Sequence, residues 1–559
     1  MRVWCRLRQL LIAFATVMTC QSSAFATQPA DDGAFRGAQW VMASAAARAV
    51  AKVGARAAIT DPQLAELVRD RQNLDVEIDK LRKAWLVAVK NGEDGQDTLR
   101  QALDDAVAQA TSLSAQITRR FPTYDEIANP RPRSIADVRS DLAEDEALLA
   151  TLTASGTVYV WVITREDTRW NRVPLSAEDL AAKVSAIRRT VGGANEVRGA
   201  DSLDDDSDRA ATDEFARLEA FDVYEALLAP FAPILSNVDH LYAVVDGSLA
   251  SLPFSLLLTQ APAEGVTDRT PLREAPFLLH QMAVTTLPSI TSLSTVRGLA
   301  NSQTSAATAG FIGFGDPLFA GVDAEPSQSE TQVASLDVNS AFRSGGADAI
   351  RSLAQLPGTR RELNDIANVF GPNSSSITLG ADASETAVKE APLTGASVIA
   401  FATHGLLAGE LDGLAEPALV FTPPRTPTSE DDGLLTASEV AALDLDAEWV
   451  ILSACNTAGS DGTPGAEGLS GLAQAFLFAG ARSILVSHWP VRDDAAARLT
   501  VDTLAALRDE PGLARSEALR RAMVKMIEDE RDPSLAHPSA WAPFVLVGDG
   551  GKRLAASAQ

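Results

Sequence analysis

The chain has 559 residues, of which 46% are hydrophobic, and a formal net charge of −26 at pH 7. Because domains usually hold about 100–200 residues, this length predicts roughly two to four folded units rather than one core. The negative charge argues against nucleic-acid backbones or anionic lipid surfaces as main partners, because like charges repel. It favours solubility and is compatible with a basic partner.

The N-terminus has the three regions of an export signal. Three arginines come first, and an apolar run over 10–20 follows that is too short to cross a bilayer, which takes about 20 residues. Ala24 and Ala26 then supply the small-residue pattern that signal peptidase cuts. We predict a signal peptide over 1–26 and a mature bacterial chain that is periplasmic or secreted. An uncleaved anchor is the alternative, and no later segment is predicted to span a membrane.

The predicted signal peptide changes how the cysteines are interpreted. The chain contains Cys5, Cys20 and Cys455, and cleavage removes the first two. One cysteine then remains in a compartment that favours disulfides, without a partner in its own chain. Such a thiol is either buried or retained for its reactivity.

Residues 27–133 are predicted to form a helical arm. Apolar side chains recur at spacings of three, four and seven over 64–85, and a second stripe covers 99–117. The stretch 91–95 between them is a turn, so the helices would form an antiparallel hairpin. Such stripes mostly pack in a core, and binding of a protein partner is the alternative. No 34-residue repeat supports a full tetratricopeptide array, although degenerate helices of that type fit.

From residue 134 the pattern alternates between strands and helices, as in an α/β protein. In the first part, we expect strands at 158–163, 170–175 and 241–245. In the second part, from residue 301, we expect strands at 311–314, 376–379, 397–402, 448–453 and 482–487, and helices at 360–369, 384–390, 469–478, 494–507 and 516–529.

Two of these strands are continuous apolar runs, at 398–401 and 449–452. Such runs are typical of parallel strands that are buried on both faces. We therefore predict an α/β fold with a mostly parallel sheet flanked by helices, preceded by the helical hairpin region. In open parallel sheets, active sites lie beyond the carboxyl ends of the strands.

The same two strands end at residues that can react together. The first runs into His404 and Gly405, and the second into Cys455, about 50 residues later, which is the spacing seen in caspases. A free thiol has a pKa near 8.5, so a nearby imidazole is needed to take its proton. The backbone N–H groups of Gly405 and Cys455 are candidates for the oxyanion hole. The alternative is that Cys455 is a small buried hydrophobe and His404 a turn residue.

Several stretches around these residues resemble the CHAT family of caspase-like domains. The strongest are 402–405, 452–458 and 467–481, and further similar stretches are 245–247, 252–254, 356–360, 489–493 and 541–548. The resemblance implies a core fold similar to caspases, separase and gingipains, with a His–Cys dyad that maps onto His404 and Cys455. It implies endopeptidase action on a protein partner and no metal or organic cofactor.

With this resemblance, we divide the chain into four parts. These are the signal peptide 1–26, the helical arm 27–133, an N-terminal α/β part at 134–300, and a caspase-like catalytic part at 301–559.

Two features depart from the family pattern: His488, and a helical part that is short for a tetratricopeptide partner domain. His488 stands where leucine is usual, and it competes with His404 for the role of base. Relatives with a basic P1 preference carry an acid two residues before the cysteine, where this chain has Ser453. Candidates for a substrate pocket are Ser453, Asp461, Glu467, Trp489 and Asp493. Each acid also fits an ordinary turn or helix-start role, and Trp489 fits a core residue.

Three functions are compatible with these observations. The first is a cysteine endopeptidase that uses Cys455 and His404. The second is a non-catalytic scaffold that keeps the fold and binds partners through its helices. The third, a serine hydrolase, is disfavoured because Gly468-Leu469-Ser470-Gly471 lacks the Gly-x-Ser-x-Gly spacing.

Overall fold

The computed structural model describes residues 27–42, 67, 71, 74, 78, 81–82, 85, 96–120, 132–154, 156–192, 214–267, 270–294, 297, 310–319, 350–351, 353–406, 414, 417–428, 430–453, 471–489 and 492–551. The chain divides into two compact units. Ala47–Pro132 form the smaller unit, and Met1–Ala46 together with Arg133–Gln559 form the larger one. The larger unit contains the strand that leads to His404 and the strand that leads towards Cys455.

A 12-stranded sheet runs through the larger unit, in the order β1-β4-β3-β2-β5-β6-β15-β14-β13-β9-β7-β8. In that order, the strands are β1 (Gln28–Pro29), β4 (Thr168–Val173), β3 (Thr157–Thr164), β2 (Glu146–Ala154), β5 (His240–Val244), β6 (Ala283–Thr286), β15 (Phe544–Gly548), β14 (Ser483–Ser487), β13 (Trp449–Leu452), β9 (Val398–Ala402), β7 (Phe311–Pro317) and β8 (Ser375–Gly380). A smaller sheet contains β10 (Gly405–Leu406), β11 (Ala418–Val420) and β12 (Leu434–Thr436).

The large sheet is mostly parallel, which confirms the predicted fold class. The pairs β2–β5, β5–β6, β6–β15, β14–β13, β13–β9, β9–β7 and β7–β8 are parallel, and the antiparallel pairs are β1–β4, β4–β3, β3–β2 and β15–β14. All residues of β9 and β13 are buried, as their apolar runs predict for strands covered on both faces.

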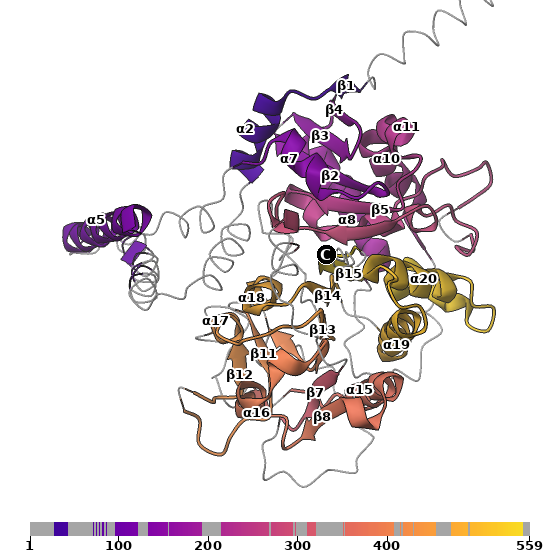
Figure 1. The fold of residues 1–559 in the computed structure, drawn as a ribbon. Coiled ribbons are helices and arrows are strands. Elements are labelled where there is room, and N and C mark those ends of the chain that lie inside the picture. The colour runs from indigo at the N-terminus through magenta and orange to yellow at the C-terminus, as the bar shows by residue number, and fades with distance from the viewer. Residues whose placement is uncertain are drawn as a thin grey trace, which may run out of the picture. The chain divides into compact units, whose positions relative to one another are not determined.

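Helices cover both faces of this sheet (Figure 1). The helices of the larger unit are α2 (Asp32–Met42), α7 (Ile135–Asp141), α8 (Ala177–Val191), α10 (Arg217–Leu227), α11 (Ala232–Leu235), α15 (Pro357–Phe370), α16 (Glu385–Glu390), α17 (Ala437–Val440), α18 (Gly471–Ala479), α19 (Asp493–Asp509), α20 (Arg515–Ile527) and α21 (Pro538–Trp541). Short 3₁₀ turns are Ala229–Phe231, Gly247–Ser251, Phe254–Leu256, Leu278–His280, Pro372–Ser374, Leu393–Gly395 and Pro533–Ala536. The helices predicted at 360–369, 384–390, 494–507 and 516–529 are confirmed to within a few residues.

Helix α15 packs unusually close to strand β7 because β7 carries two glycines. A Cβ placed on Gly315 would lie 2.7 Å from Leu363 Cδ1 and 2.8 Å from the Ala402 carbonyl oxygen. A Cβ on Gly313 would lie 3.1 Å from Leu363 Cδ2. Real Cβ atoms essentially never approach a neighbour as closely as at Gly315, and the contact at Gly313 would also be unusually tight. These glycines therefore permit the short distance between α15 and the sheet.

In the smaller unit, α5 (Gln96–Arg120) is the helix whose whole length is described. Helical residues Leu74, Ile78 and Leu81 pack with Ala106 and Ala110 of α5. Arg71 Nε also donates a hydrogen bond to Ser114 Oγ at 2.8 Å. Because lower-numbered residues of the first stripe meet higher-numbered residues of α5, the two segments run antiparallel, as the predicted hairpin requires.

A buried ionic joint ties the far end of the chain to the middle of the sheet. It comprises Glu146 at the start of β2, Tyr242 in β5, Arg297 after β6, and Asp549 after β15. Arg297 lies 2.7 Å from the Glu146 carboxylate and 3.6 Å from that of Asp549, and Tyr242 donates to Asp549 at 3.1 Å. Burial alone would raise the pKa of Glu146, but hydrogen bonds from His240 and Arg297 lower it to about 2. The joint therefore holds charged, mutually compensated groups.

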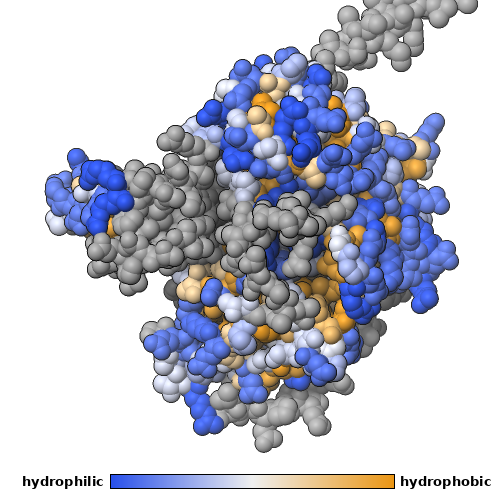
Figure 2. Space-filling model, in the orientation of Figure 1, coloured by the Kyte–Doolittle hydropathy of each residue, from blue (hydrophilic) through white to orange (hydrophobic). Residues whose placement is uncertain are grey.

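On the face that Figure 2 draws, the described surface is largely hydrophilic. Figure 2 shows hydrophilic side chains over α5 and over much of the larger unit. Over the parts of the chain that the structure describes, no helix is both long and apolar enough to cross a membrane.

Candidate functional site

Strands β9 and β13 lie side by side and run in the same direction. Phe401 pairs with Leu452, and the Ser453 N–H donates to the Phe401 carbonyl at 2.9 Å. Strand β9 leads into His404, whereas β13 leads into Ser453, two residues before Cys455. Cys455 lies outside the described residues, as do Asp461 and Glu467. Ser453, two residues before Cys455, therefore lies beside the end of the strand that leads into His404.

The imidazole of His404 is held in one orientation. Its Nε2 lies 2.9 Å from the carbonyl oxygen of Ala354, in the segment before α15. Its ring also contacts Phe319, with ring centroids 5.0 Å apart. A carbonyl oxygen can only accept a hydrogen bond, so Nε2 carries the proton. In the neutral ring, the lone pair is then on Nδ1, which is the form a general base requires.

The backbone on either side of His404 is anchored to the smaller sheet. Thr403 Oγ1 donates to the Val420 carbonyl, and the Val420 N–H donates to the His404 carbonyl at 2.9 Å. This second bond makes Gly405 and Leu419 a non-hydrogen-bonded pair of the antiparallel ladder. Strand β11 therefore does not use the N–H of Gly405, the group that the sequence proposes for the oxyanion hole.

The competing histidine, His488, lies in a different environment. It follows β14, on the other side of β13, and is only 4% exposed. Burial, assisted by the nearby Arg188 charge, lowers the pKa of His488 to about 3. A ring that is so deeply buried cannot exchange protons readily with a substrate. The half-buried His404 is the histidine of the two that can do so.

Trp489, a predicted pocket residue, packs within the core. Its side chain is 2% exposed and stacks under the Arg188 guanidinium, whose Cζ lies 4.6 Å from the indole centre. Arg188 also donates to the His488 carbonyl at 3.3 Å. Trp489 thus presents almost no surface to a substrate in this conformation. Asp493 begins α19, and its side chain lies outside the described part of the structure.

Ser453, the remaining pocket candidate, is bonded to a buried acid that the sequence analysis did not single out. Ser453 Oγ donates to Glu362 Oε1 at 2.6 Å, and the two residues are 5% and 2% exposed. Glu362 is on α15, next to the buried Leu363. An acid in the apolar stripe of a helix was the available signal, because a carboxyl at such a position needs a specific partner.

The start of α15 is fastened to the end of β7 by Asp316. This residue has a left-handed backbone, with φ of +48°, and is 7% exposed. Its carboxylate accepts hydrogen bonds from Arg360 Nε at 2.7 Å and Gln355 Nε2 at 3.0 Å, and its N–H donates to Thr359 Oγ1 at 3.1 Å. These bonds hold the segment whose Ala354 carbonyl orients His404. This contact was not predicted from the sequence either.

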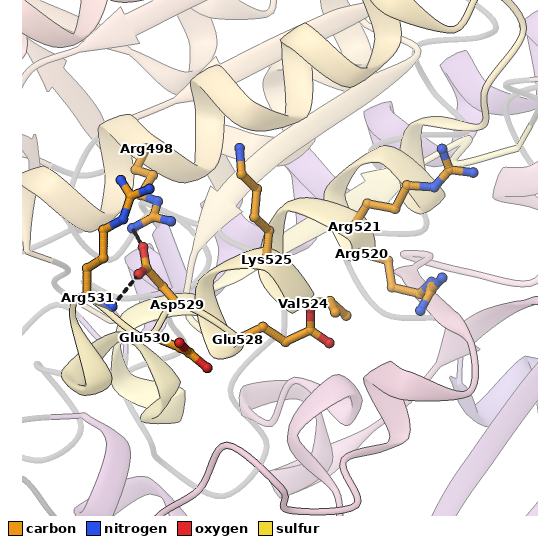
Figure 3. A pocket seen from close by; sticks show the side chains of 9 residues that line it. All are labelled: Arg498, Arg520, Arg521, Val524, Lys525, Glu528, Asp529, Glu530 and Arg531. Carbon is orange, nitrogen blue, oxygen red and sulfur yellow. Dashed lines mark hydrogen bonds and ion pairs between the residues drawn. The ribbon is translucent and has the colours of Figure 1, made fainter.

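A separate surface hollow of about 810 Å³ lies along α19, α20 and the turn that follows (Figure 3). Its charged lining is largely paired within the chain. Arg498 lies 2.6 Å from Asp529, and Lys525 lies 2.7 Å from Asp502. None of the predicted site residues lines it. Among the side chains that the structure describes, no group of three or more His, Cys, Asp or Glu residues could hold a metal ion.

Comparison with known proteins identifies the family. The CHAT domain model matches residues 219–549, more than half of the sequence, so the chain belongs to the CHAT family. Tetratricopeptide repeat protein 28 of Homo sapiens is 38% identical over 115 residues, which cover 21% of this chain. The matched region spans only 4% of that relative's length.

Two solved structures show weaker likeness. The separase–securin complex of Saccharomyces cerevisiae matches with a TM-score of 0.41 and 12% identity, over 82% of this chain and 34% of that one. Gingipain R (RgpB) of Porphyromonas gingivalis, an Arg-specific cysteine proteinase, matches with a TM-score of 0.32 and 12% identity, over 67% of this chain and 74% of the proteinase chain.

Proposed function

We propose that the chain is a cysteine endopeptidase that cuts a protein partner, with Cys455 as nucleophile and His404 as base. The observation that carries the proposal is the orientation of His404. The Ala354 carbonyl holds the His404 Nε2 atom. His404 follows β9, which lies beside β13, the strand that runs towards Cys455. Membership of the CHAT family supports the same assignment.

The proposed reaction has two stages. In the first, Nδ1 of His404 takes the thiol proton of Cys455, and the sulfur attacks the carbonyl carbon of the peptide bond. The C–N bond then breaks as His404 returns the proton to the leaving amine, which leaves a thioester. In the second stage, water attacks the thioester with His404 as base, and the products are a free thiol and a carboxylic acid.

Each attack places negative charge on the former carbonyl oxygen. Donors aimed at that oxygen lower the barrier, and loss of one such donor typically costs about 10²–10³-fold in rate. The Gly405 N–H, which the ladder with β11 does not use, is one proposed donor, and the Cys455 N–H is the other. Glycine at position 405 also lets a substrate approach the backbone without a Cβ in the way.

The reactivity of Cys455 tests this proposal without knowledge of the substrate. The purified chain is treated with iodoacetamide over a range of pH, and alkylation of the peptide that carries Cys455 is followed by mass spectrometry. We expect Cys455 at pH 6 to react about tenfold faster in the folded chain than in urea, because pairing with His404 increases the thiolate fraction. Cleavage of a peptide library is measured in parallel.

Two variants and one control complete the test. His404→Ala should abolish the excess reactivity, and Cys455→Ala should abolish peptide cleavage. His280→Ala replaces an exposed histidine outside the site and should leave both unchanged. A folded Cys455 that reacts no faster than in urea, or cleavage that persists in Cys455→Ala, would contradict the proposal.

A second candidate function is a non-catalytic scaffold that binds a protein partner through the helical unit Ala47–Pro132. The division of the chain favours this candidate, because Ala47–Pro132 form a compact unit of their own. Pull-down of a partner by the full chain separates the two functions. Capture that is unchanged in Cys455→Ala and His404→Ala, with no proteolysis by the unmodified chain, supports the scaffold.

We also propose that the chain is exported and cut after Ala26. The test is the N-terminal sequence of the protein recovered from a periplasmic fraction, which should begin at Thr27. A chain that retains Met1 and remains with the membrane fraction would instead support an uncleaved anchor.

A further inference from the structure

A single segment, residues 354–362, contacts the chain just beyond the ends of the two strands that lead to the proposed dyad. Ala354, three residues before α15, orients His404 through its carbonyl oxygen. Glu362, in the second turn of α15, accepts the hydrogen bond of Ser453, which precedes Cys455 by two residues. The segment from 354 to 362 therefore reaches across β9 and touches the chain on either side of the proposed site.

The contact at Glu362 depends on the close approach of α15 to the sheet. Gly313 and Gly315 leave room for Leu363 directly against β7, and Leu363 is fully buried. Asp316 fixes the start of the helix through Arg360 and Gln355. Both ends of the segment 354–362 are therefore held in place, so Glu362 has little freedom to move. Its hydrogen bond in turn restrains Ser453.

A carboxyl group in this location has an energetic cost that ordinary packing does not explain. Burial of a carboxyl group is unfavourable unless hydrogen bonds compensate it, and a 2.6 Å O–H···O contact is at the short, strong end of the range. A small apolar residue would cover the sheet at lower cost. One group that bonds this carboxyl is the Ser453 hydroxyl, two residues before Cys455 in the sequence.

We propose that Glu362 is a positioning residue: it holds Ser453, two residues before Cys455, while Ala354 of the same segment orients His404. This inference rests on the proposed function. In this arrangement, the segment 354–362 sets the relative placement of sulfur and imidazole, although neither this segment nor Ser453 takes part in the chemistry. A misplacement of about 1 Å at a reacting group can cost about 10²-fold in rate.

The experiment measures the pH dependence of Cys455 alkylation by iodoacetamide in the full chain, together with kcat and KM for a peptide selected from the library. Glu362→Ala should move the alkylation midpoint towards the ordinary thiol value near 8.5 and lower kcat about 10–100-fold, with KM little changed. Glu362→Gln keeps an oxygen that can accept the Ser453 hydrogen bond, so it should recover most of the rate. Asp365→Asn, a matched change at a half-buried acid of the same helix, should leave both readouts unchanged.

The Ser453 variants show whether Glu362 acts through the serine. Ser453→Ala should reproduce the effect of Glu362→Ala, and the double variant should be no slower than the slower single variant, because both changes remove one interaction. Ser453→Ala also keeps the proposal testable if Glu362→Ala fails to fold.

Three results would overturn the proposal. They are a lower melting temperature in Glu362→Ala with an unchanged alkylation midpoint and kcat, a Glu362→Gln variant as slow as Glu362→Ala, and additive effects in the double variant. A failure of the proposed function looks different. In that case, Cys455 of the unmodified chain already titrates as an ordinary thiol and is insensitive to His404→Ala.

Discussion

The buried ionic joint and the strand ends at β9 and β13 hold their polar groups in different ways. In the joint, the carboxylates of Glu146 and Asp549 share the Arg297 guanidinium, and all three groups are charged. At the strand ends, the His404 ring bonds a neutral carbonyl, and the Glu362 carboxyl holds a serine hydroxyl. The joint compensates charge within a core, which makes it sensitive to the loss of one partner. The strand ends instead orient groups while leaving His404 half-buried, as proton transfer requires.

The variant expected to distinguish the strand ends most clearly from the ionic joint is His404→Ala. His404→Ala removes the proposed base, so kcat should fall by about 10²–10⁴-fold. The melting temperature should change little, because the ring is half-buried. Steady-state kinetics and thermal unfolding of the same samples check this. A large drop in melting temperature with unchanged turnover per folded molecule would reverse the roles assigned here.

The opposite pattern is expected for Arg297. Arg297→Ala leaves the Glu146 and Asp549 carboxylates buried without their guanidinium, which typically costs about 3–5 kcal/mol of unfolding free energy. Turnover per folded molecule should be unchanged. Urea unfolding measures the cost, and Arg508→Ala, which breaks an exposed pair with Asp509, is the control that should have little effect. Equal stability of the two variants would show that the joint is not what holds the C-terminus.

The joint also predicts how stability depends on pH. The pKa of Glu146 is lowered to about 2 in the folded chain, against an ordinary value of 4.5. A lowered pKa contributes stability above the ordinary value, and this contribution is lost as the pH falls from about 4.5 to about 2. The shift corresponds to roughly 3 kcal/mol. Glu146→Gln should therefore be less stable than the unmodified chain at pH 7, and the difference should shrink below pH 4. A pH-independent difference would assign the effect to packing.

The smallest expected effect links stability to the site. Gly315→Ala forces a Cβ against Leu363 and the Ala402 carbonyl oxygen, so α15 must move outwards at a cost of about 1–3 kcal/mol. Because α15 carries Glu362, the reactivity of Cys455 should fall as well. Gly156→Ala, where nothing lies within 4 Å, is the control. If Gly315→Ala is less stable but Cys455 alkylation is unchanged, the position of α15 does not affect the reactivity of Cys455.

Local pattern was sufficient to predict much of the architecture. The apolar runs of β9 and β13 predicted buried parallel strands, and the placement of His404 at a strand end followed from the same runs. Helices were also predicted at 360–369, 494–507 and 516–529, where α15, α19 and α20 lie. These features depend on periodicity within a few turns or a few strand residues, which a sequence displays directly.

The hydrogen bonds and ion pairs that support the site and the ionic joint could not be predicted in this way. Glu362 and Ser453 are 91 residues apart, Glu146 and Arg297 are 151 apart, and Tyr242 and Asp549 are 307 apart. No periodicity records such pairings. Ser453 was selected as a pocket candidate because it lies two residues before Cys455, and Trp489 because it belongs to the family-like stretch 489–493, yet both side chains are buried. Proximity along the chain does not determine which face of a strand end a side chain takes.

The sequence by itself determined the α/β class, the family, and the two strand ends that carry His404 and lead to Cys455. The reason is that a buried strand and the motif at its end are formed by consecutive residues. Only the tertiary structure decided which nitrogen of His404 holds the proton, which histidine is accessible, and which acid supports Ser453. Those outcomes depend on hydrogen bonds between distant segments, and the strand order that brings such segments together is set by the packing of the whole sheet.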